Sequence, residues 1–278
     1  MKGDSLQIKS HVSHDAESSR VYLMSLHPDD FPQIINYMDD LAQANTYTKL
    51  FAKVPAKYGP DFLKSGYGIE ASVPCFYDGK EDALFLTKYL SDERRLPEED
   101  ALENFQKLLL QAPVSKTTQI DPDFLLKPLG AADASSMVDV FKQVFDSYPF
   151  PIFDPAFIVK SMQKDGTRYF GIYDDEQLVA ISSAECCNDH KNAEMTDFAV
   201  IPAYRGKGFA SILLSFMEQE LTNEGFLTFY TIARLHSIAM NKTFYDAGYQ
   251  YAGTLTRNTQ ISGKIESMNV WYKHNFLA

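Results

Sequence analysis

Cysteine and tryptophan are scarce in this chain of 278 residues, which has three cysteines and one tryptophan. Three cysteines cannot build a disulfide framework. Cys186 and Cys187 are neighbours in an apolar segment, so their side chains are expected on opposite faces of a strand, where they are poorly placed to hold a metal. We therefore expect no metal and interpret all three thiols, Cys75 included, as buried and reduced.

Positive charge is also in short supply. The chain has 26 lysines and arginines against 37 aspartates and glutamates, a net charge of −11. Nucleic acids and anionic membrane surfaces would repel such a chain, whereas a small cationic substrate would be attracted. No apolar run approaches the length of about 18 residues that a membrane helix needs, and residues 1–5 lack the apolar core of a signal peptide. We expect a cytoplasmic protein with a small-molecule partner and no nucleic-acid or membrane partner.

The rest of the composition is that of a globular protein, with 45% hydrophobic and 23% charged residues. The length leaves room for two domains. The charged, proline-containing segment 112–123 predicts a linker, so we divide the chain into an N-terminal α/β domain, 1–120, and a second domain, 121–278. The polar start of the chain, up to about residue 12, is expected to be loose.

Apolar periodicity predicts an order of elements for each half. In 1–120 we expect strands at 21–26, 48–54, 68–73 and 83–89 and helices at 28–44, 61–64 and 98–111, with Asp78-Gly79 as a hairpin turn. In 121–278 we expect strands at 124–129, 167–173, 177–187, 193–200, 227–235, 249–259 and 265–272 and helices at 131–145, 155–164, 208–224 and 238–247.

Residues 198–210, Phe-Ala-Val-Ile-Pro-Ala-Tyr-Arg-Gly-Lys-Gly-Phe-Ala, carry the strongest functional signal. An apolar strand gives way to a glycine loop, and a helix follows at once. Backbone N–H groups of 206–210, with the helix dipole behind them, would converge on one concavity suited to a pyrophosphate. The Gly-Lys-Ser/Thr ending of a Walker loop is missing, and the glycine spacing does not fit a Rossmann loop. An ordinary strand–turn–helix corner is the alternative interpretation.

The spacing Arg205-x-x-Gly208-x-Ala210 resembles the Arg/Gln-x-x-Gly-x-Gly/Ala signature of the GNAT N-acetyltransferases. The resemblance implies an α/β protein of the α+β type, with a mixed, mostly antiparallel sheet flanked by helices in 121–278. Residues 1–120 would be a fused α/β domain or a degenerate half of the same fold. The implied cosubstrate is acetyl-CoA, bound by Phe198, Ala199, Val200, Arg205, Gly206, Lys207, Gly208, Phe209 and Ala210. Asn241, a polar residue among apolar helix positions, is expected to add a hydrogen bond to it.

Acetyl transfer to an amine requires a base, because an alkyl ammonium has a pKa of about 10.4. Glu194 is our first candidate, since in a regular strand it shares a face with Phe198 and Val200. The resemblance supports it, because the histone-acetyltransferase branch of the family carries a glutamate base at this offset. Glu185 is the reserve candidate, and a solvated strand residue is the alternative for Glu194.

The acid that protonates the leaving thiolate has two candidates. The resemblance places a tyrosine at the position of Phe244, and the tyrosine of this chain is next to it, at Tyr245. Either the helix is rotated slightly and Tyr245 acts as the acid, or water protonates the thiolate.

Residues 68–77, 237–241 and 253–273 resemble the bacterial and archaeal β-lysine N-acetyltransferases. This resemblance implies acetylation of N6 of L-β-lysine, downstream of lysine 2,3-aminomutase, with the product serving as an osmolyte (compatible solute) or in lysine metabolism. A zwitterionic diamine needs carboxylates for its ammonium groups and a donor for its carboxylate. The candidates are Tyr148, Phe150, Phe153, Asp197, Asn258, Glu266 and Asn269, with Arg257 as an alternative donor.

Two alternative hypotheses stay open. In the first, the acceptor amine is a polyamine, lysine or a protein lysine. In the second, the protein is a non-catalytic acyl-CoA-sensing module, and the only support for it is Phe244 in place of the family tyrosine. A homodimer also stays open.

Overall fold

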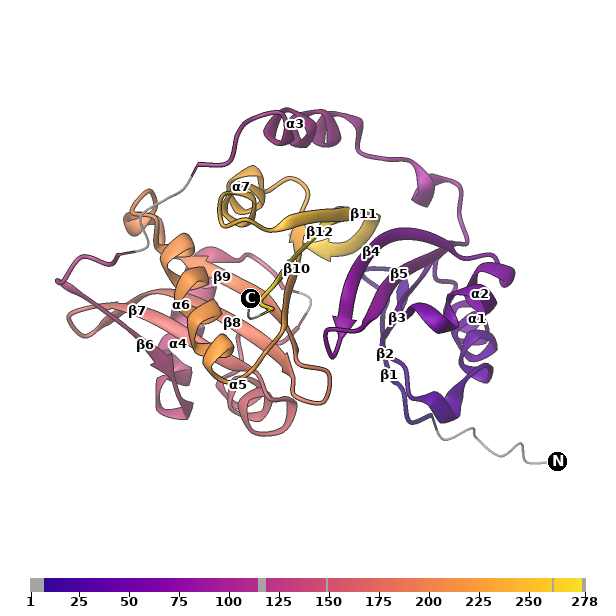
Figure 1. Cartoon of the computed structure of the whole chain (residues 1–278), viewed down its shortest axis with the longest axis horizontal. Coiled ribbons are helices and arrows are strands. Elements are labelled where there is room, and N and C mark those ends of the chain that lie inside the picture. The colour runs from indigo at the N-terminus through magenta and orange to yellow at the C-terminus, as the bar shows by residue number, and fades with distance from the viewer. Residues whose placement is uncertain (1–7, 115–118, 149, 262, 277–278) are drawn as a thin grey trace.

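The computed structural model describes residues 8–114, 119–148, 150–261 and 263–276. One sheet of 12 strands runs through both halves of the chain, in the order β1-β2-β3-β5-β4-β11-β12-β10-β9-β8-β7-β6. Figure 1 shows α1 and α2 beside the N-terminal strands, α4, α5 and α6 beside the C-terminal ones, and α3 spanning the space between the two groups. The expected α/β fold class, with a mixed sheet flanked by helices, is confirmed.

The described part of the N-terminal half contains five strands and three α-helices. They are β1 (His11–Asp15), β2 (Arg20–Ser25), α1 (Gln33–Asn45), β3 (Lys49–Pro55), α2 (Gly59–Lys64), β4 (Gly68–Tyr77), β5 (Glu81–Tyr89) and α3 (Glu99–Leu109). The helix α1 buries Ile34, Ile35 and Met38 at helical spacing, which explains why this segment folds as an amphipathic helix on the sheet. The expected β4–β5 hairpin is present as an antiparallel pair.

Two expectations for this half were wrong in detail. The start of the chain is not loose throughout, because His11–Asp15 forms β1 and pairs with β2; main-chain hydrogen bonds supply this pairing whatever the side chains are. Residues 1–7 and 115–118 of the predicted loose segment and linker lie outside the described residues. The helix expected at 28–44 is divided into a 3-10 turn, Pro28–Asp30, and α1, because Phe31 precedes a proline and takes an extended conformation.

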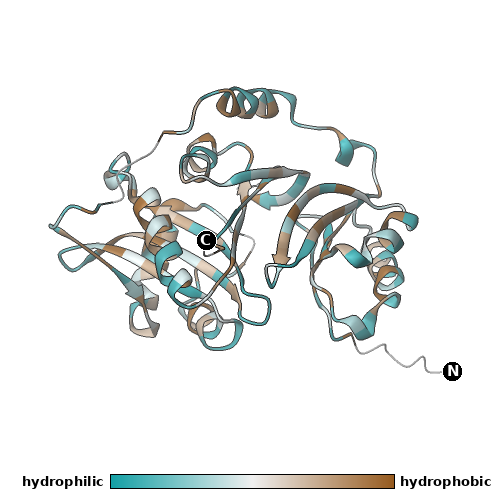
Figure 2. Cartoon of the chain, viewed as in Figure 1, coloured by the Kyte–Doolittle hydropathy of each residue, from teal (hydrophilic) through white to brown (hydrophobic). Residues whose placement is uncertain are grey.

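The C-terminal half contains every element that the sequence predicts. They are β6 (Phe124–Leu129), α4 (Ala134–Val144), α5 (Pro155–Lys160), β7 (Arg168–Asp174), β8 (Gln177–Cys187), β9 (Asn192–Val200), α6 (Phe209–Asn223), β10 (Thr228–Arg234), α7 (Ile238–Asp246), β11 (Gln250–Ile261) and β12 (Lys264–His274). The largest hydrophobic cluster includes Phe141, Leu213, Met217 and Trp271 of this half, and Phe105 of α3 packs into it. Figure 2 shows apolar residues along these strands and polar residues on the loops.

The two halves repeat one topology. In the N-terminal half β2 pairs parallel with β3, which pairs antiparallel with β5, and β4 follows next to β5. In the C-terminal half β9, β10, β12 and β11 have the same relationship. The two halves meet in the middle of the sheet, where Gly253 of β11 pairs with Ala71 of β4. A Cβ on Gly253 would lie 2.1 Å from the carbonyl oxygen of Glu70, so this junction requires glycine. The domain division at residue 120 stays a prediction.

Candidate active site

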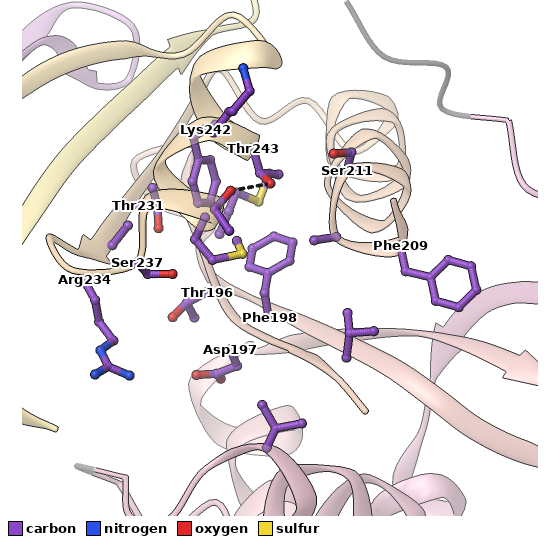
Figure 3. Close-up of a pocket in the computed structure, with 18 of the residues that line it drawn as sticks. Thr196, Asp197, Phe198, Phe209, Ser211, Thr231, Arg234, Ser237, Lys242 and Thr243 are labelled. Carbon is purple, nitrogen blue, oxygen red and sulfur yellow. Dashed lines mark hydrogen bonds between the residues drawn. The ribbon is translucent and has the colours of Figure 1, made fainter. Parts of the chain in front are cut away.

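The central feature of the site is the divergence of β9 from β10. The two strands pair in parallel only from Asn192 to Glu194 and from Thr228 to Tyr230. Beyond Glu194 they separate, and a cavity of about 980 Å³ opens between them. Figure 3 shows Thr196 and Phe198 of β9 on one side of this cavity and Thr231, Ser237 and Thr243 on the other. The separation leaves main-chain groups of β9 available to a ligand, because β10 no longer pairs with them.

A bulge at Asp197 gives β9 its local shape. Thr196 pairs with Ser183 and Ala199 with Ile181, so β9 has one residue more than β8 between these pairs. Asp197 has a φ of 53°, in the left-handed region. Its side chain therefore joins those of Thr196 and Phe198 at the cavity, although a regular strand would place it on the opposite face (Figure 3).

The Asp197 carboxylate is held by two hydroxyl groups. The Tyr148 hydroxyl donates a hydrogen bond to Oδ1, and the Ser183 hydroxyl donates one to Oδ2 at 2.5 Å. Burial raises the pKa of Asp197, and these two donors oppose the shift. Burial and the neighbouring Asp197 charge raise the pKa of Tyr148. Asp197 is thus fixed in position in the wall of the cavity.

The loop between β9 and α6 forms an open corner with the geometry of an anion site. Gly206 and Gly208 have φ values of 85° and 78°, and a Cβ on either would meet no atom within 4 Å. Gly208 is the N-cap of α6, so the N–H groups of Phe209 and Ala210 lie in the first turn, without intrahelical acceptors. Arg205 and Lys207 expose their side chains beside these groups. The positive end of the helix dipole, free N–H groups and two cationic side chains fit a diphosphate.

Most of the residues predicted to bind the cosubstrate line the cavity: Phe198, Val200, Arg205, Gly206, Lys207, Gly208, Phe209 and Ala210. Ala199 does not, because its side chain is fully buried in the core. The ring of Phe209 packs against that of Phe124, 5.0 Å between centroids, and points away from the other labelled side chains in Figure 3. Phe209 therefore offers mainly its backbone.

Asn241 does not face the cavity, contrary to our expectation. Its side chain is fully buried. Its Nδ2 donates to the carbonyl oxygens of Arg234 and Ser237, each at 2.9 Å. Its Oδ1 accepts from Asn269 Nδ2 and Trp271 Nε1, also at 2.9 Å. The amide is fully used in joining α7 to β10 and β12, so it has no group left for a ligand.

Tyr245 is also away from the cavity. Its hydroxyl donates to the carbonyl oxygen of Gln111 at 2.8 Å, just beyond the end of α3. Phe244 instead lines the cavity, and its ring lies edge-on to Phe198 with 5.7 Å between centroids. The helix is therefore not rotated in the way that a role for Tyr245 requires. The identity of the acid stays a prediction.

A second, smaller pocket of about 100 Å³ adjoins the cavity, and we call it the acceptor pocket. Its walls come from both halves of the chain: Arg20, Tyr22, Met24 and Phe51 from the N-terminal half, and Phe150, Glu185, Glu194, Asn258 and Thr259 among others from the C-terminal half. Tyr148, Thr196, Asp197, Ile232, Ile261 and Met268 line both spaces. The two spaces therefore meet at the Asp197 bulge.

Three carboxylates, Glu185, Glu194 and Asp197, line the acceptor pocket. Glu185 is exposed within this concavity, and desolvation by the surrounding protein, followed by the neighbouring Glu194 and Asp197 charges, raises its pKa to about 8. Burial also raises the pKa of Glu194, while the Lys53 ammonium and the Tyr230 hydroxyl lower it. A cationic ligand would favour the ionised form of these carboxyl groups, so the pocket is suited to one.

The residues predicted to bind the amine divide into two groups. Tyr148, Phe150, Asp197 and Asn258 line the acceptor pocket. Phe153 packs against the core instead. Glu266 is buried and accepts hydrogen bonds from Arg234 at 2.7 and 2.8 Å. Asn269 is fully buried in the Asn241 network, and Arg257 donates to the carbonyl oxygen of Leu96. The sequence predicted that these three polar side chains bind the substrate, but in the structure they make hydrogen bonds within the protein.

Arg20 and Tyr22 are pocket residues that our sequence analysis missed. The available signal was a charged residue directly before the apolar strand that begins at Val21. The corresponding corner of the N-terminal half, between β2 and α1, has no glycine loop and carries Asp29 and Asp30 instead. It therefore offers negative charge where the β9–α6 corner offers an anion site.

Among the described residues, no group of three or more His, Cys, Asp or Glu side chains is placed to hold a metal ion. No helix in the same described ranges is long and apolar enough to cross a membrane.

Comparison with known proteins agrees with this geometry. Residues 137–247 match the acetyltransferase (GNAT) family. The chain is 38% identical over 261 residues to the β-lysine N(6)-acetyltransferase of Methanococcus maripaludis, covering 92% of this chain and 93% of that protein. It is 33% identical over 216 residues to the N-acetyltransferase YodP of Bacillus subtilis, covering 77% and 78%. It is 34% identical over 154 residues to the β-lysine N(6)-acetyltransferase of Methanosarcina mazei, covering 55% and 56%.

Two strands that separate next to a glycine-loop anion site are typical of acyl-CoA-dependent acyltransferases. The relatives reported above are acetyltransferases of this class. The chain belongs to the acetyltransferase (GNAT) family and is an N-acetyltransferase. The resemblance seen in the sequence is thereby confirmed.

Proposed function

We propose that the chain transfers the acetyl group of acetyl-CoA to N6 of L-β-lysine. The observation that carries this proposal is the meeting of the cavity and the carboxylate-lined acceptor pocket at the Asp197 bulge. One space offers an anion site to the phosphates of the cosubstrate, and the other offers negative charge to a cationic acceptor. The relatives named for β-lysine acetylation, one of them matched along almost its whole length, support this choice of amine.

In this proposal acetyl-CoA supplies an activated thioester. The N–H groups of 206–210 bind its diphosphate together with Arg205 and Lys207, and the unpaired edge of β9 binds the pantetheine arm, with Phe198 and Val200 beside it. These contacts fix the thioester next to the acceptor pocket, which turns a bimolecular reaction into a positioned one.

Glu194 is the proposed base. It lines the acceptor pocket at the last paired position of β9, where the strands begin to separate. Its carboxylate takes a proton from the acceptor ammonium, and the resulting amine attacks the thioester carbonyl carbon. The nitrogen of the tetrahedral intermediate then loses its extra proton to water, the C–S bond breaks, and the leaving thiolate takes a proton from water. The products are the N-acetyl amine and the CoA thiol, and Glu194 returns its proton to solvent. The raised pKa of Glu194 suits this role, because a more basic carboxylate is a better proton acceptor.

The test is a turnover assay with acetyl-CoA and a panel of acceptors: L-β-lysine, α-lysine, putrescine and a lysine-containing peptide. We expect the highest kcat/KM with β-lysine, and mass spectrometry of the product should place the acetyl group on N6. A clear preference for putrescine or the peptide would replace β-lysine with that acceptor. Binding of acetyl-CoA without turnover of any acceptor would instead favour the acyl-CoA-sensing alternative.

The metabolic role of the product depends on β-lysine being the substrate. A role as a compatible solute or in lysine metabolism, with β-lysine supplied by a lysine 2,3-aminomutase, is part of the same proposal. Homodimer formation and a cytoplasmic location likewise stay predictions.

A further inference from the structure

Arg20, at the start of β2, is a buried cation without a counterion among the described residues. Its side chain is 8% exposed. Nη1 donates to Thr259 Oγ1 at 2.9 Å, and Nε is buried without an acceptor in the described part of the chain. Its Cζ lies 5.1 and 5.9 Å from the ring centroids of Tyr22 and Phe51, which attract the cation without accepting a hydrogen bond from Nε. A buried guanidinium with one hydrogen bond and no carboxylate in ion-pair contact among the described residues is still costly, unless a ligand supplies the missing anion.

Arg94 shows what a structural arginine looks like in the same region. Its side chain is 5% exposed, so it is as buried as Arg20. Its Nε and Nη2 donate to the carbonyl oxygens of Arg257 and Ser18, each at 2.6 Å, and its Nη1 donates to Thr48 Oγ1 at 2.8 Å. Every nitrogen of this guanidinium has an acceptor. Burial in the fold therefore does not by itself explain the free donors of Arg20.

A second unpaired polar atom lies in the same pocket. Asn258, 1% exposed, lines the acceptor pocket with Arg20, and its Oδ1 is buried without a donor in the described ranges. Asn258 lies within the irregular stretch of β11 between Leu255 and Thr259. The pocket thus contains a free donor group with positive charge and a free acceptor, besides the carboxylates of Glu185 and Glu194.

This set matches an amino acid with a second, distant amine. A ligand carboxylate would neutralise the Arg20 guanidinium and accept its free hydrogen bond, and the ligand ammonium next to that carboxylate would donate to Asn258 Oδ1. The far ammonium would then lie toward Glu194 and the cavity. A polyamine has no group for the guanidinium and would leave it unpaired, which disfavours that acceptor.

We propose that Arg20 binds the carboxylate of the acceptor amino acid, so that the N-terminal half of the chain sets the selectivity for amino acids over simple diamines. This inference rests on the proposed function. It gives residues 1–120 a direct part in acceptor recognition, through the first residue of β2.

The test compares two acceptors that differ only in the carboxylate. They are L-β-lysine and 1,4-diaminopentane, in which hydrogen replaces the carboxyl group. Arg20→Met should lower kcat/KM for β-lysine by about 10²-fold or more, because a buried charge-assisted contact is lost. The same variant should leave kcat/KM for the diamine and the KM for acetyl-CoA almost unchanged. Arg20→Lys keeps the charge without the planar fork and should give an intermediate loss.

Arg94→Met is the matched control. It removes an equally buried guanidinium and should lower the melting temperature, but the ratio of kcat/KM for the two acceptors should not change. Equal losses for both acceptors in Arg20→Met would overturn the inference. If Arg20→Met fails to fold, the ratio measured with Arg20→Lys decides instead.

The inference and the proposed function fail in different ways. Absence of β-lysine turnover by the wild-type enzyme would remove the proposed function, whatever Arg20 does. Normal wild-type turnover with an unchanged acceptor ratio in both Arg20 variants would remove only the inference.

Discussion

Glu185 and Glu194 lie directly opposite each other on β8 and β9, and both side chains line the acceptor pocket. Like charges at opposed positions of antiparallel strands repel each other. The electrostatic cost of placing these two carboxylates together is consistent with a role in binding a cationic ligand, because a cation between them would remove the repulsion.

The first prediction concerns the pH dependence of stability. Glu185 is exposed within the acceptor pocket, where desolvation by the surrounding protein and the facing carboxylates raise its pKa from the usual 4.5 to about 8. Between these values the folded protein binds more protons than the unfolded chain, so its contribution to stability falls as pH rises from about 4.5 to 8. Glu185→Gln should weaken this dependence and gain in relative stability toward pH 8, as measured by urea unfolding across the range.

The control for this measurement is Glu176→Gln, an exposed residue before the start of β8. The free energy of unfolding of this variant should depend on pH in the same way as that of the wild type. If Glu185→Gln also keeps the wild-type pH dependence, the facing carboxylates do not hold a proton.

The second prediction identifies the base. Glu194→Gln should lower kcat by about 10²-fold or more, because an amide cannot accept the proton, while the affinity for acetyl-CoA changes little. Glu185→Gln, on the facing strand, should cost less in kcat. Stopped-flow turnover and calorimetry separate the two effects. An unaltered rate in Glu194→Gln would move the base to another residue of the acceptor pocket.

Much of the molecule was predictable because its signals are local. The β9–α6 corner, for example, follows from a proline, an arginine and two glycines within seven residues, Pro202–Gly208. Periodicity likewise predicted the order of elements in the second half. These features depend on neighbours along the chain, which a single sequence contains.

The errors concern residues whose partners are distant. Asn241 had the look of a ligand-binding amide, but its acceptor oxygen serves Asn269 and Trp271, which are 28 and 30 residues away. Arg20 enters the site through a contact with Thr259, 239 residues away. Tertiary pairing over such separations leaves no periodic trace, so burial and hydrogen bonding of these polar side chains could not be read in advance.

The third prediction concerns the anion corner. Gly208→Asp should abolish acetyl-CoA binding in calorimetry, because it places bulk and negative charge where the phosphates bind. Gly225→Asp is a matched control: Gly225 has a φ of 83° against 78° for Gly208, and its Cβ position is equally open, but it follows the end of α6 outside the cavity. Both variants bear similar backbone strain, so only the loss of binding distinguishes them. Full binding by Gly208→Asp would remove the proposed cosubstrate site.

The last prediction separates a structural role from a catalytic one on α7. Asn241→Leu leaves the buried N–H groups of Asn269 and Trp271 without their acceptor and should destabilise the fold by about 3 kcal/mol. Tyr245→Phe removes one hydrogen bond to Gln111 and should cost about 1 kcal/mol. Urea unfolding measures both losses.

Neither variant should change the affinity of the folded protein for acetyl-CoA, and Tyr245→Phe should retain the wild-type kcat, because its hydroxyl lies away from the cavity. A fall in kcat of about tenfold or more in Tyr245→Phe, with stability retained, would restore that tyrosine as the acid. Weaker acetyl-CoA binding by folded Asn241→Leu would likewise return the amide to the cosubstrate site. The pair of measurements therefore decides whether α7 acts on the thioester through Phe244 and the backbone alone.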